Sequence, residues 1–182
     1  MKTSWRFSIL LTILTLVMAT GCASTRAPSD QAMINDARAT LDRFTDRDPG
    51  LQSWVNGAHG YAVFPEIGKG GFIAGGAFGR GMVFERGEPV GRTSVSQATL
   101  GAQIGGQSYS QVIFFQDDAA LRTFQRGNLE FSAQATAVAA TAGAAATTSY
   151  EKGVAVFILT RGGLMAEATI GGQRYTYNPL ED

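Results

Sequence analysis

The chain has 182 residues, 45% of them hydrophobic, with 15 basic and 15 acidic side chains. This length suits a single domain with a hydrophobic core of its own. The balanced charge provides no strongly basic face, so nucleic acid is not expected as a partner.

The first 22 residues have the pattern of a bacterial lipoprotein signal. Lys2 and Arg6 form a short basic start, an uncharged apolar stretch follows over 7–18, and residues 19–22 read Ala-Thr-Gly-Cys. This pattern is typical of a secretory signal, and the apolar stretch is shorter than the ~20 residues that a membrane-spanning helix needs. We therefore expect cleavage before Cys22 and lipidation of its thiol. Ordinary secretion with a stray cysteine is the alternative.

Processing at this cysteine would set the domain boundaries. Removal of Lys2 and Arg6 leaves 13 basic against 15 acidic residues, a net charge of about −2. With Cys22 lipidated, no thiol remains for a disulfide or a metal site. We expect a lipoprotein signal peptide at 1–21, a lipid-anchored tether at 22–30 and a folded domain at 31–182.

The acyl anchor also predicts a location. Each buried methylene contributes about 0.8 kcal/mol, so several acyl chains on one residue hold a protein firmly in a membrane. Ala23, rather than aspartate, follows the cysteine. In lipoproteins of enteric-type bacteria, which this signal resembles, that residue implies export to the outer membrane.

An amphipathic helix is predicted directly after the tether. Apolar residues recur at helical spacing at Ile34, Ala37, Leu41 and Phe44. The helix should begin near Ser29 or Asp30 and end before Pro49-Gly50. Its apolar stripe is expected to pack on the chain's own domain, with contact to a membrane as the alternative. A short second helix is predicted over 51–55.

From Gly60 onward the hydrophobic pattern has a period of two, which indicates β-strands. Alternating stretches cover 72–84, 98–114 and 129–139, and a buried strand is predicted over 154–160.

Two further local signals stand in this β-rich part. Residues 165–170 and 174–177 flank Gly171-Gly172, which is typical of a β-hairpin. Asp117 is expected to cap a short helix that ends at Gly127 and turns Leu121 and Phe124 inward.

The order helix, strands, helix, strands predicts an α+β fold that is mainly β. Glycine within long strands permits the close approach and sharp bends of a strongly curved sheet. We expect a curved antiparallel sheet or a closed β-barrel, flanked by short helices.

Motifs for catalysis are absent from the sequence. His59 is the only histidine and is expected to follow a helix end. No serine stands in a Gly-x-Ser-x-Gly elbow, and residues 68–71 (Gly-Lys-Gly-Gly) lack the spacing of a phosphate loop. Asp117-Asp118 could bind a cation, but such pairs usually cap helices. We expect no catalytic residues, no metal ligands and no cofactor.

Binding is the remaining class of function. Four cations stand beside glycines or at strand ends and could form one basic rim that meets lipid phosphates: Lys69, Arg80, Lys152 and Arg161. Scattered solvated charges are the alternative. Phe72, Phe78 and Phe84 could line a lipid pocket, and an ordinary core is the alternative.

Several phrases together resemble the SYLF family, also called the lipid-binding and actin-regulator-like family. They are Gly60-Tyr61-Ala62-Val63-Phe64-Pro65, Lys69-Gly70-Gly71-Phe72, the glycines at 75, 76, 79 and 81, the stretch 96–107, and Gly162-Gly163-Leu164. The resemblance spans roughly 31–178. It implies, for bacterial members, a lipoprotein with a β-barrel, flanking helices and lipid binding. Eukaryotic relatives bind phosphoinositides and, in fungi, actin.

The leading hypothesis is a non-enzymatic outer-membrane lipoprotein whose domain binds phospholipid at the periplasmic membrane surface. The alternative is an interaction module of the envelope that holds a protein partner through the polar strand face Gln103, Gln107, Tyr109 and Gln111. An enzyme is the third alternative, because no catalytic motif is assembled.

Overall fold

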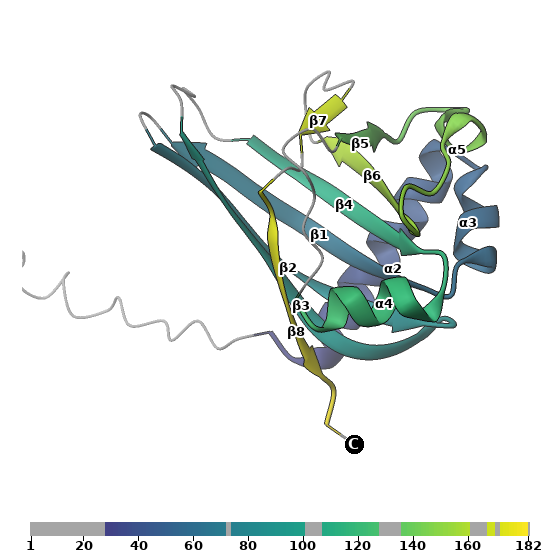
Figure 1. Ribbon diagram of the computed structural model, residues 1–182, viewed down its shortest axis with the longest axis horizontal. Helices are drawn as coiled ribbons and strands as arrows, with labels where there is room; N and C mark the ends of the chain where they lie inside the picture. Colours follow the sequence, from purple (N-terminus) through teal and green to yellow (C-terminus); the bar gives the residue numbers. More distant parts are fainter. Residues whose placement is uncertain are drawn as a thin grey trace, which may run out of the picture.

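A computed structural model describes residues 28–71, 74–100, 107–127, 136–160, 167–169 and 172–181. Cys22 and the signal segment lie outside these residues. In chain order the elements are α2 (Asp30–Arg47), α3 (Leu51–Gly57), β1 (Gly60–Gly71), β2 (Ala74–Glu85), β3 (Glu88–Leu100), β4 (Gln107–Phe115), α4 (Asp118–Gln125), β5 (Thr136–Ala139), α5 (Ala144–Thr147), β6 (Val154–Thr160), β7 (Glu167–Thr169) and β8 (Arg174–Pro179). Figure 1 shows one long sheet with α2 behind it and α4 in front. The expected α+β, mainly β class is confirmed.

The strands form one open sheet in the order β7-β5-β6-β4-β1-β2-β3-β8. Neighbouring strands are antiparallel except β5 and β6, which are parallel. Within the described residues, β7 and β8 end this order at opposite edges and no pairing joins them. The closed-barrel alternative is therefore not supported. The curved sheet remains, and it is mixed rather than purely antiparallel.

The predicted hairpin around Gly172 is not seen among the described residues. β7 pairs with β5, whereas β8 pairs with β3. Seven strand spacings of about 4.8 Å would put these edges about 34 Å apart in a flat sheet. The five residue steps from Thr169 to Arg174 reach at most about 18 Å. The sheet must therefore curl strongly, so that its two edges approach each other at this end.

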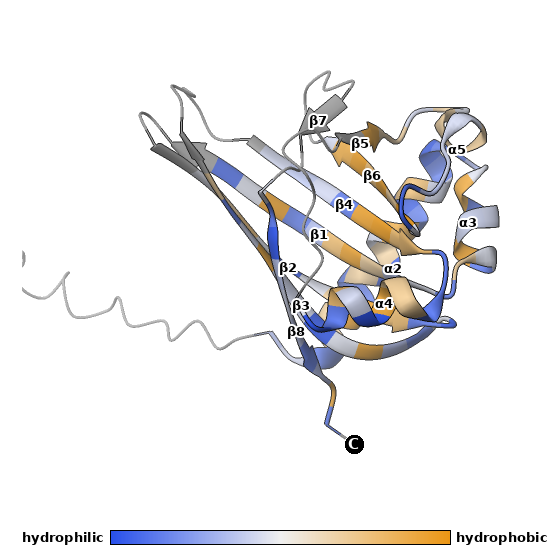
Figure 2. Cartoon of the chain, in the orientation of Figure 1, coloured by the Kyte–Doolittle hydropathy of each residue, from blue (hydrophilic) through white to orange (hydrophobic). Residues whose placement is uncertain are grey.

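The sheet has a hydrophobic core on each face. The first core lies between the sheet and the helices α2, α3 and α5. It contains the four residues of the predicted stripe of α2, together with Met82, Phe84, Val112, Phe114 and Phe157 from the strands. The second core lies between the other face of the sheet and α4. It contains Leu121 and Phe124 of α4, together with Phe64, Ile67, Ile113, Phe115 and Tyr175 from the strands. Figure 2 shows how hydrophobic much of β4 and β6 is. The expected packing of the amphipathic helix on its own domain is confirmed.

The predicted helix ends are also confirmed. Ser29 caps α2, since its Oγ accepts a hydrogen bond from the Ala32 N–H at 3.3 Å. Asp117 caps α4, with its Oδ1 accepting from the Ala120 N–H at 2.8 Å. Each cap satisfies a backbone donor that the first turn of a helix leaves unpaired. Gly127 follows α4 with a φ of +71°, which glycine adopts readily.

A bulge interrupts β1 at Pro65. Between Val63 and Glu66, β1 has one residue more than β2, and the ladder with β4 shifts at the same place. Proline has no N–H to give to a ladder, so a bulge lets it occupy a central strand. The Pro65 carbonyl accepts a hydrogen bond from Ser110 Oγ at 2.7 Å. After the bulge, the side chains of β1 alternate in the opposite phase.

Among the described residues, no helix has the length and apolar character needed to cross a membrane.

Candidate functional site

Two open grooves border α2 where it lies against the sheet. One, of about 540 Å³, lies between the start of α2 and strands β3 and β8. The other, of about 640 Å³, lies between α2 and strands β1 and β2. Pro28, Met33 and Arg80 line both grooves. We call the two together the α2 groove, with Arg80 as its shared residue on the sheet.

Two glycines determine how Arg80 stands in β2. A Cβ at Gly79 would lie 2.8 Å from the Glu66 carbonyl oxygen, and one at Gly81 would lie 2.3 Å from that of Val63. No side chain fits there, because the bulged part of β1 lies too close. Arg80, between them, projects to the opposite face, where α2 packs. The glycine-rich strand β2 therefore presents the long, positively charged side chain of Arg80 on the face where α2 packs.

Phe78 stands beside Arg80 on the same face of β2. Among the described residues, Phe78 is the large hydrophobic residue that is exposed, with 54% of its surface accessible. The Arg80 guanidinium carbon lies 5.9 Å from the centroid of the Phe78 ring, within the range of a cation–π contact. Phe84, by contrast, is 1% exposed and belongs to the core. The two phenylalanines lie on the same face of β2, but Phe78 is exposed and Phe84 is packed in the core.

The arginines of the α2 groove differ in their partners. Arg92 forms a two-pronged contact with the Asp30 carboxylate, with its Nη2 2.7 Å from Oδ2. The hydrogen bonds from Arg92 hold the pKa of Asp30 below its usual value. Arg43 donates to Thr40 Oγ1 at 2.7 Å. The ion pairs recorded within the described ranges include neither Arg43 nor Arg80.

The larger groove carries both signs of charge. Arg43 and Arg80 line it together with Asp36 and Glu66. A phosphate group would be favoured near the guanidinium groups, and an ammonium group near the carboxylates. Mixed charge of this kind suits a zwitterionic or weakly anionic ligand better than a highly charged polyanion.

Of the predicted rim cations the structure describes Lys69, Arg80 and Lys152, and it does not bring these three together. Lys69 follows Ile67 on the α4 face of the sheet, opposite Arg80. Lys152 lies in the turn before β6, in a smaller groove beside α4 of about 260 Å³. Lys152 lies at the end of the sheet where β1 begins at Gly60. Lys69 is nine residues further along β1, which corresponds to about 30 Å. Arg161 and Phe72 lie outside the described residues.

The polar strand face proposed to hold a protein partner is largely inside the fold. Gln111 is 0% exposed and Tyr109 is 5% exposed. Gln111 Nε2 donates to the Tyr175 hydroxyl at 2.9 Å, and Gln173 Nε2 donates to that of Tyr109 at 3.1 Å. Burial raises the pKa of both tyrosines. A partner cannot reach Tyr109 and Gln111 in this fold, and the side chains of Gln103 and Gln107 lie outside the described part.

The helix side of the α2 groove was missed by reasoning from the sequence. Met33, Asp36, Thr40 and Arg43 all line the larger groove. They recur at intervals of three or four residues and so form a second stripe beside the apolar one. The stripe was present in the sequence, but only the fold shows that it faces Arg80.

His59 lies where it was expected, two residues after the end of α3 and directly before β1. Its ring nitrogen Nε2 faces Glu85 and Asp118. These residues are 26 and 59 positions away in the chain, so no local pattern indicates the cluster.

Comparison with known proteins identifies relatives. Residues 96–179 match the Ysc84 family, which is described as "Las17-binding protein actin regulator". The chain is also 30% identical over 142 residues to Beta cell expansion factor A of Aeromonas veronii, an alignment that covers 76% of this chain and 53% of that protein. The chain thus spans about half the length of this curated relative. Neither name describes an enzyme.

Proposed function

We propose that this chain, which belongs to the Ysc84 (SYLF) family, is a non-enzymatic lipoprotein whose domain binds phospholipid in the α2 groove. The membrane would be the bacterial outer membrane, at its periplasmic face, with Cys22 carrying the acyl anchor. The observation that carries the proposal is the exposed Phe78 next to Arg80, on the face where both grooves meet.

This pair suits an amphiphile because one side chain offers charge and the other offers apolar surface. The Arg80 guanidinium can donate hydrogen bonds to a lipid phosphate, and such charge-assisted bonds are among the stronger ones. Phe78 and Met33 offer apolar surface to the first part of an acyl chain. Arginine can also lay its apolar stem along a lipid while its charged end stays at the polar surface of the membrane.

The proposed anchor would hold the groove close to the membrane. Pro28, which lines both grooves, comes six residues after Cys22. Six residues span at most about 22 Å even when fully extended. A lipid attached at Cys22 would therefore keep the α2 groove within about one bilayer leaflet of the headgroups.

The test is co-sedimentation of the chain from Ala23 to Asp182 with liposomes. This chain keeps every described helix and strand and lacks the acyl anchor. Liposomes of phosphatidylethanolamine would be compared with mixtures containing phosphatidylglycerol or cardiolipin, at low and high salt. We expect binding that Arg80→Ala weakens about fivefold, since one basic residue near an anionic surface contributes about 1 kcal/mol. Phe78→Ala should weaken it further in every mixture.

The matched control is Arg126→Ala, which removes the same charge from an exposed position just after α4, on the other face. It should bind as the parent chain does. If the parent chain binds no liposome, or if Arg80→Ala and Phe78→Ala bind normally, the groove does not read lipid. Membrane contact would then rest on the acyl anchor alone.

The family description, which names binding of a protein, favours a second candidate. A protein partner would use the same α2 groove, because the polar face of β4 is buried. Loss of a captured envelope protein on Arg80→Ala, without loss of liposome binding, would favour this candidate over the first.

A further inference from the structure

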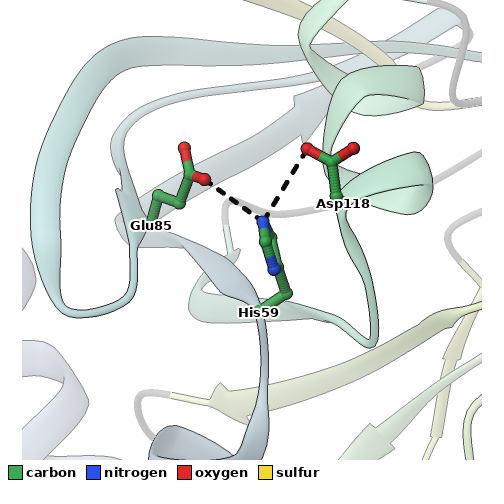
Figure 3. A group of neighbouring side chains, drawn as sticks. All are labelled: His59, Glu85 and Asp118. Atoms are coloured by element: carbon green, nitrogen blue, oxygen red, sulfur yellow. Dashed lines mark hydrogen bonds and ion pairs between the residues drawn. The ribbon is translucent and has the colours of Figure 1, made fainter.

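Three side chains that can bind a metal meet at one end of the sheet. His59 precedes β1, Glu85 ends β2 and Asp118 begins α4. Figure 3 shows the His59 ring directed at both carboxylates. Its Nε2 lies 3.1 Å from Glu85 Oε1 and 3.8 Å from Asp118 Oδ1. One ligand atom from each residue lies within 4.8 Å of the others. The cluster is distant from the α2 groove and plays no part in the proposed lipid binding.

The backbone and a neighbouring arginine hold these groups in place. The His59 N–H donates to the Phe115 carbonyl at 2.9 Å, and the His59 carbonyl accepts from the Arg86 N–H at 3.1 Å. Arg122 Nε donates to Asp118 Oδ2 at 2.7 Å, which leaves Oδ1 on the side of His59. Such outer contacts orient the ligands of known metal sites and strengthen binding.

The two distances from His59 Nε2 are close to those between the ligand atoms of a small metal ion. Zinc binds nitrogen and carboxylate oxygen at about 2.0–2.2 Å in a tetrahedron, where two ligand atoms lie about 3.3–3.6 Å apart. The two distances from Nε2, 3.1 and 3.8 Å, stand on either side of this range. A metal would therefore need shifts of only a few tenths of an ångström along these two edges.

A proton on the His59 ring explains the position of the two carboxylates less well than a metal ion does. A single N–H on Nε2 can donate to Glu85, but Asp118 at 3.8 Å lies beyond hydrogen-bond distance. A divalent cation placed between them could contact all three groups at once. Such a cation would also compensate the charge of both carboxylates, of which Arg122 pairs with Asp118 alone.

We propose that His59, Glu85 and Asp118 bind a divalent transition metal of the zinc class. One imidazole with two carboxylates is a donor set that zinc and its neighbours accept, whereas magnesium and calcium prefer oxygen alone. The two carboxylates are 37% and 46% exposed, so the fourth position of the metal faces solvent. The metal would tie the start of β1 and the end of β2 to the start of α4.

The test uses the chain from Ala23 to Asp182, purified without a polyhistidine tag. This chain contains one histidine and no cysteine, so imidazole or thiol ligands elsewhere cannot contribute. Zn²⁺ would be titrated by calorimetry, Co²⁺ by its visible absorption, and Tm followed with and without Zn²⁺. We expect one metal per chain and a higher Tm with Zn²⁺, because a ligand of the folded state stabilises it.

The variants His59→Ala, Glu85→Gln and Asp118→Asn should each weaken metal binding at least tenfold and abolish the Tm shift. Glu88→Gln is the matched control, since it makes the same change three residues away, at an exposed position outside the cluster. Circular dichroism checks that each variant folds. Absence of saturable binding by the parent chain, or binding that His59→Ala leaves unchanged, would overturn the proposal.

Discussion

The carboxylate of Asp48 accepts a hydrogen bond from the backbone N–H of Ala145 at 2.7 Å, across 97 positions of the chain. Its other oxygen accepts from the Gly50 N–H at 3.1 Å, and the residue is only 2% exposed. One buried carboxylate thus joins the corner between α2 and α3 to the start of α5.

Replacing this carboxylate should destabilise the fold. Asp48→Ala leaves buried backbone N–H groups without acceptors, and hydrogen bonds to charged groups contribute about 1.5–3 kcal/mol each. We expect the free energy of unfolding to fall by about 2–4 kcal/mol, measured by urea denaturation. Asp46→Ala, at an exposed position in the last turn of α2, should change it by about 0.5 kcal/mol or less. Equal effects of the two substitutions would contradict the assigned role.

The same residue predicts a loss of stability in acid. Burial raises the pKa of Asp48, but hydrogen bonds from the backbone N–H groups of Ala145, Gly143, Gly50 and Ala144 outweigh burial and hold the pKa below its ordinary value of 3.8. A carboxyl with a lowered pKa stabilises the fold above the unfolded-state value, and this contribution is lost as the pH falls through the folded-state value. Urea denaturation between pH 2.5 and 6 should show this loss, and Asp48→Asn should flatten the curve below pH 4. An unchanged slope in the variant would be evidence against the assignment.

The two phenylalanines of β2 should respond differently to truncation. Phe84→Ala opens a cavity in the core beneath α2 and should lower the free energy of unfolding by about 3–5 kcal/mol. Phe78→Ala removes an exposed ring and should lower it by about 0.5 kcal/mol or less. Thermal and urea unfolding of both variants would check this. A large loss of stability on Phe78→Ala would mean that the ring is needed for folding rather than for binding.

Two glycines provide a comparable pair. A Cβ at Gly81 would collide with the backbone of Val63, whereas a Cβ at Gly68 would meet nothing within 4 Å. Gly81→Ala should therefore destabilise by about 1–3 kcal/mol, as overpacking does. Gly68→Ala should be neutral or slightly stabilising, because alanine restricts the unfolded chain more than glycine. Similar values for both would show that β1 can move away from β2 without penalty.

The sequence predicted those features that neighbouring residues control. The periodicity of Ile34, Ala37, Leu41 and Phe44 identified the buried face of α2, and Ser29 and Asp117 were recognised as caps because each acts within its own first turn. The strand pairings could not be read in this way. A turn at Gly172 indicates where the chain bends, not which of two distant strands it joins next.

The candidate site was predicted only in part for the same reason. Arg80 and Phe78 were among the predicted binding residues and border the proposed groove, but Lys69 and Lys152 were grouped with Arg80 because all stand near glycines. Alternation assigns the face of a strand only until a bulge, and the extra residue at Pro65 moves Lys69 to the face opposite Arg80. The distance to Lys152 depends on strand order, which the sequence does not display.

Pro65 has a wider consequence than one missing hydrogen bond. Both ladders of β1 shift at this point, so the strand holds two halves whose inward and outward positions are exchanged. If the same residues ran as a regular strand without the bulge, Ile67 would turn out of its core and Gly68 would take its place. The bulge therefore determines which side of the sheet every later residue of the strand occupies, and deleting Pro65 would remove the bulge while keeping those sides.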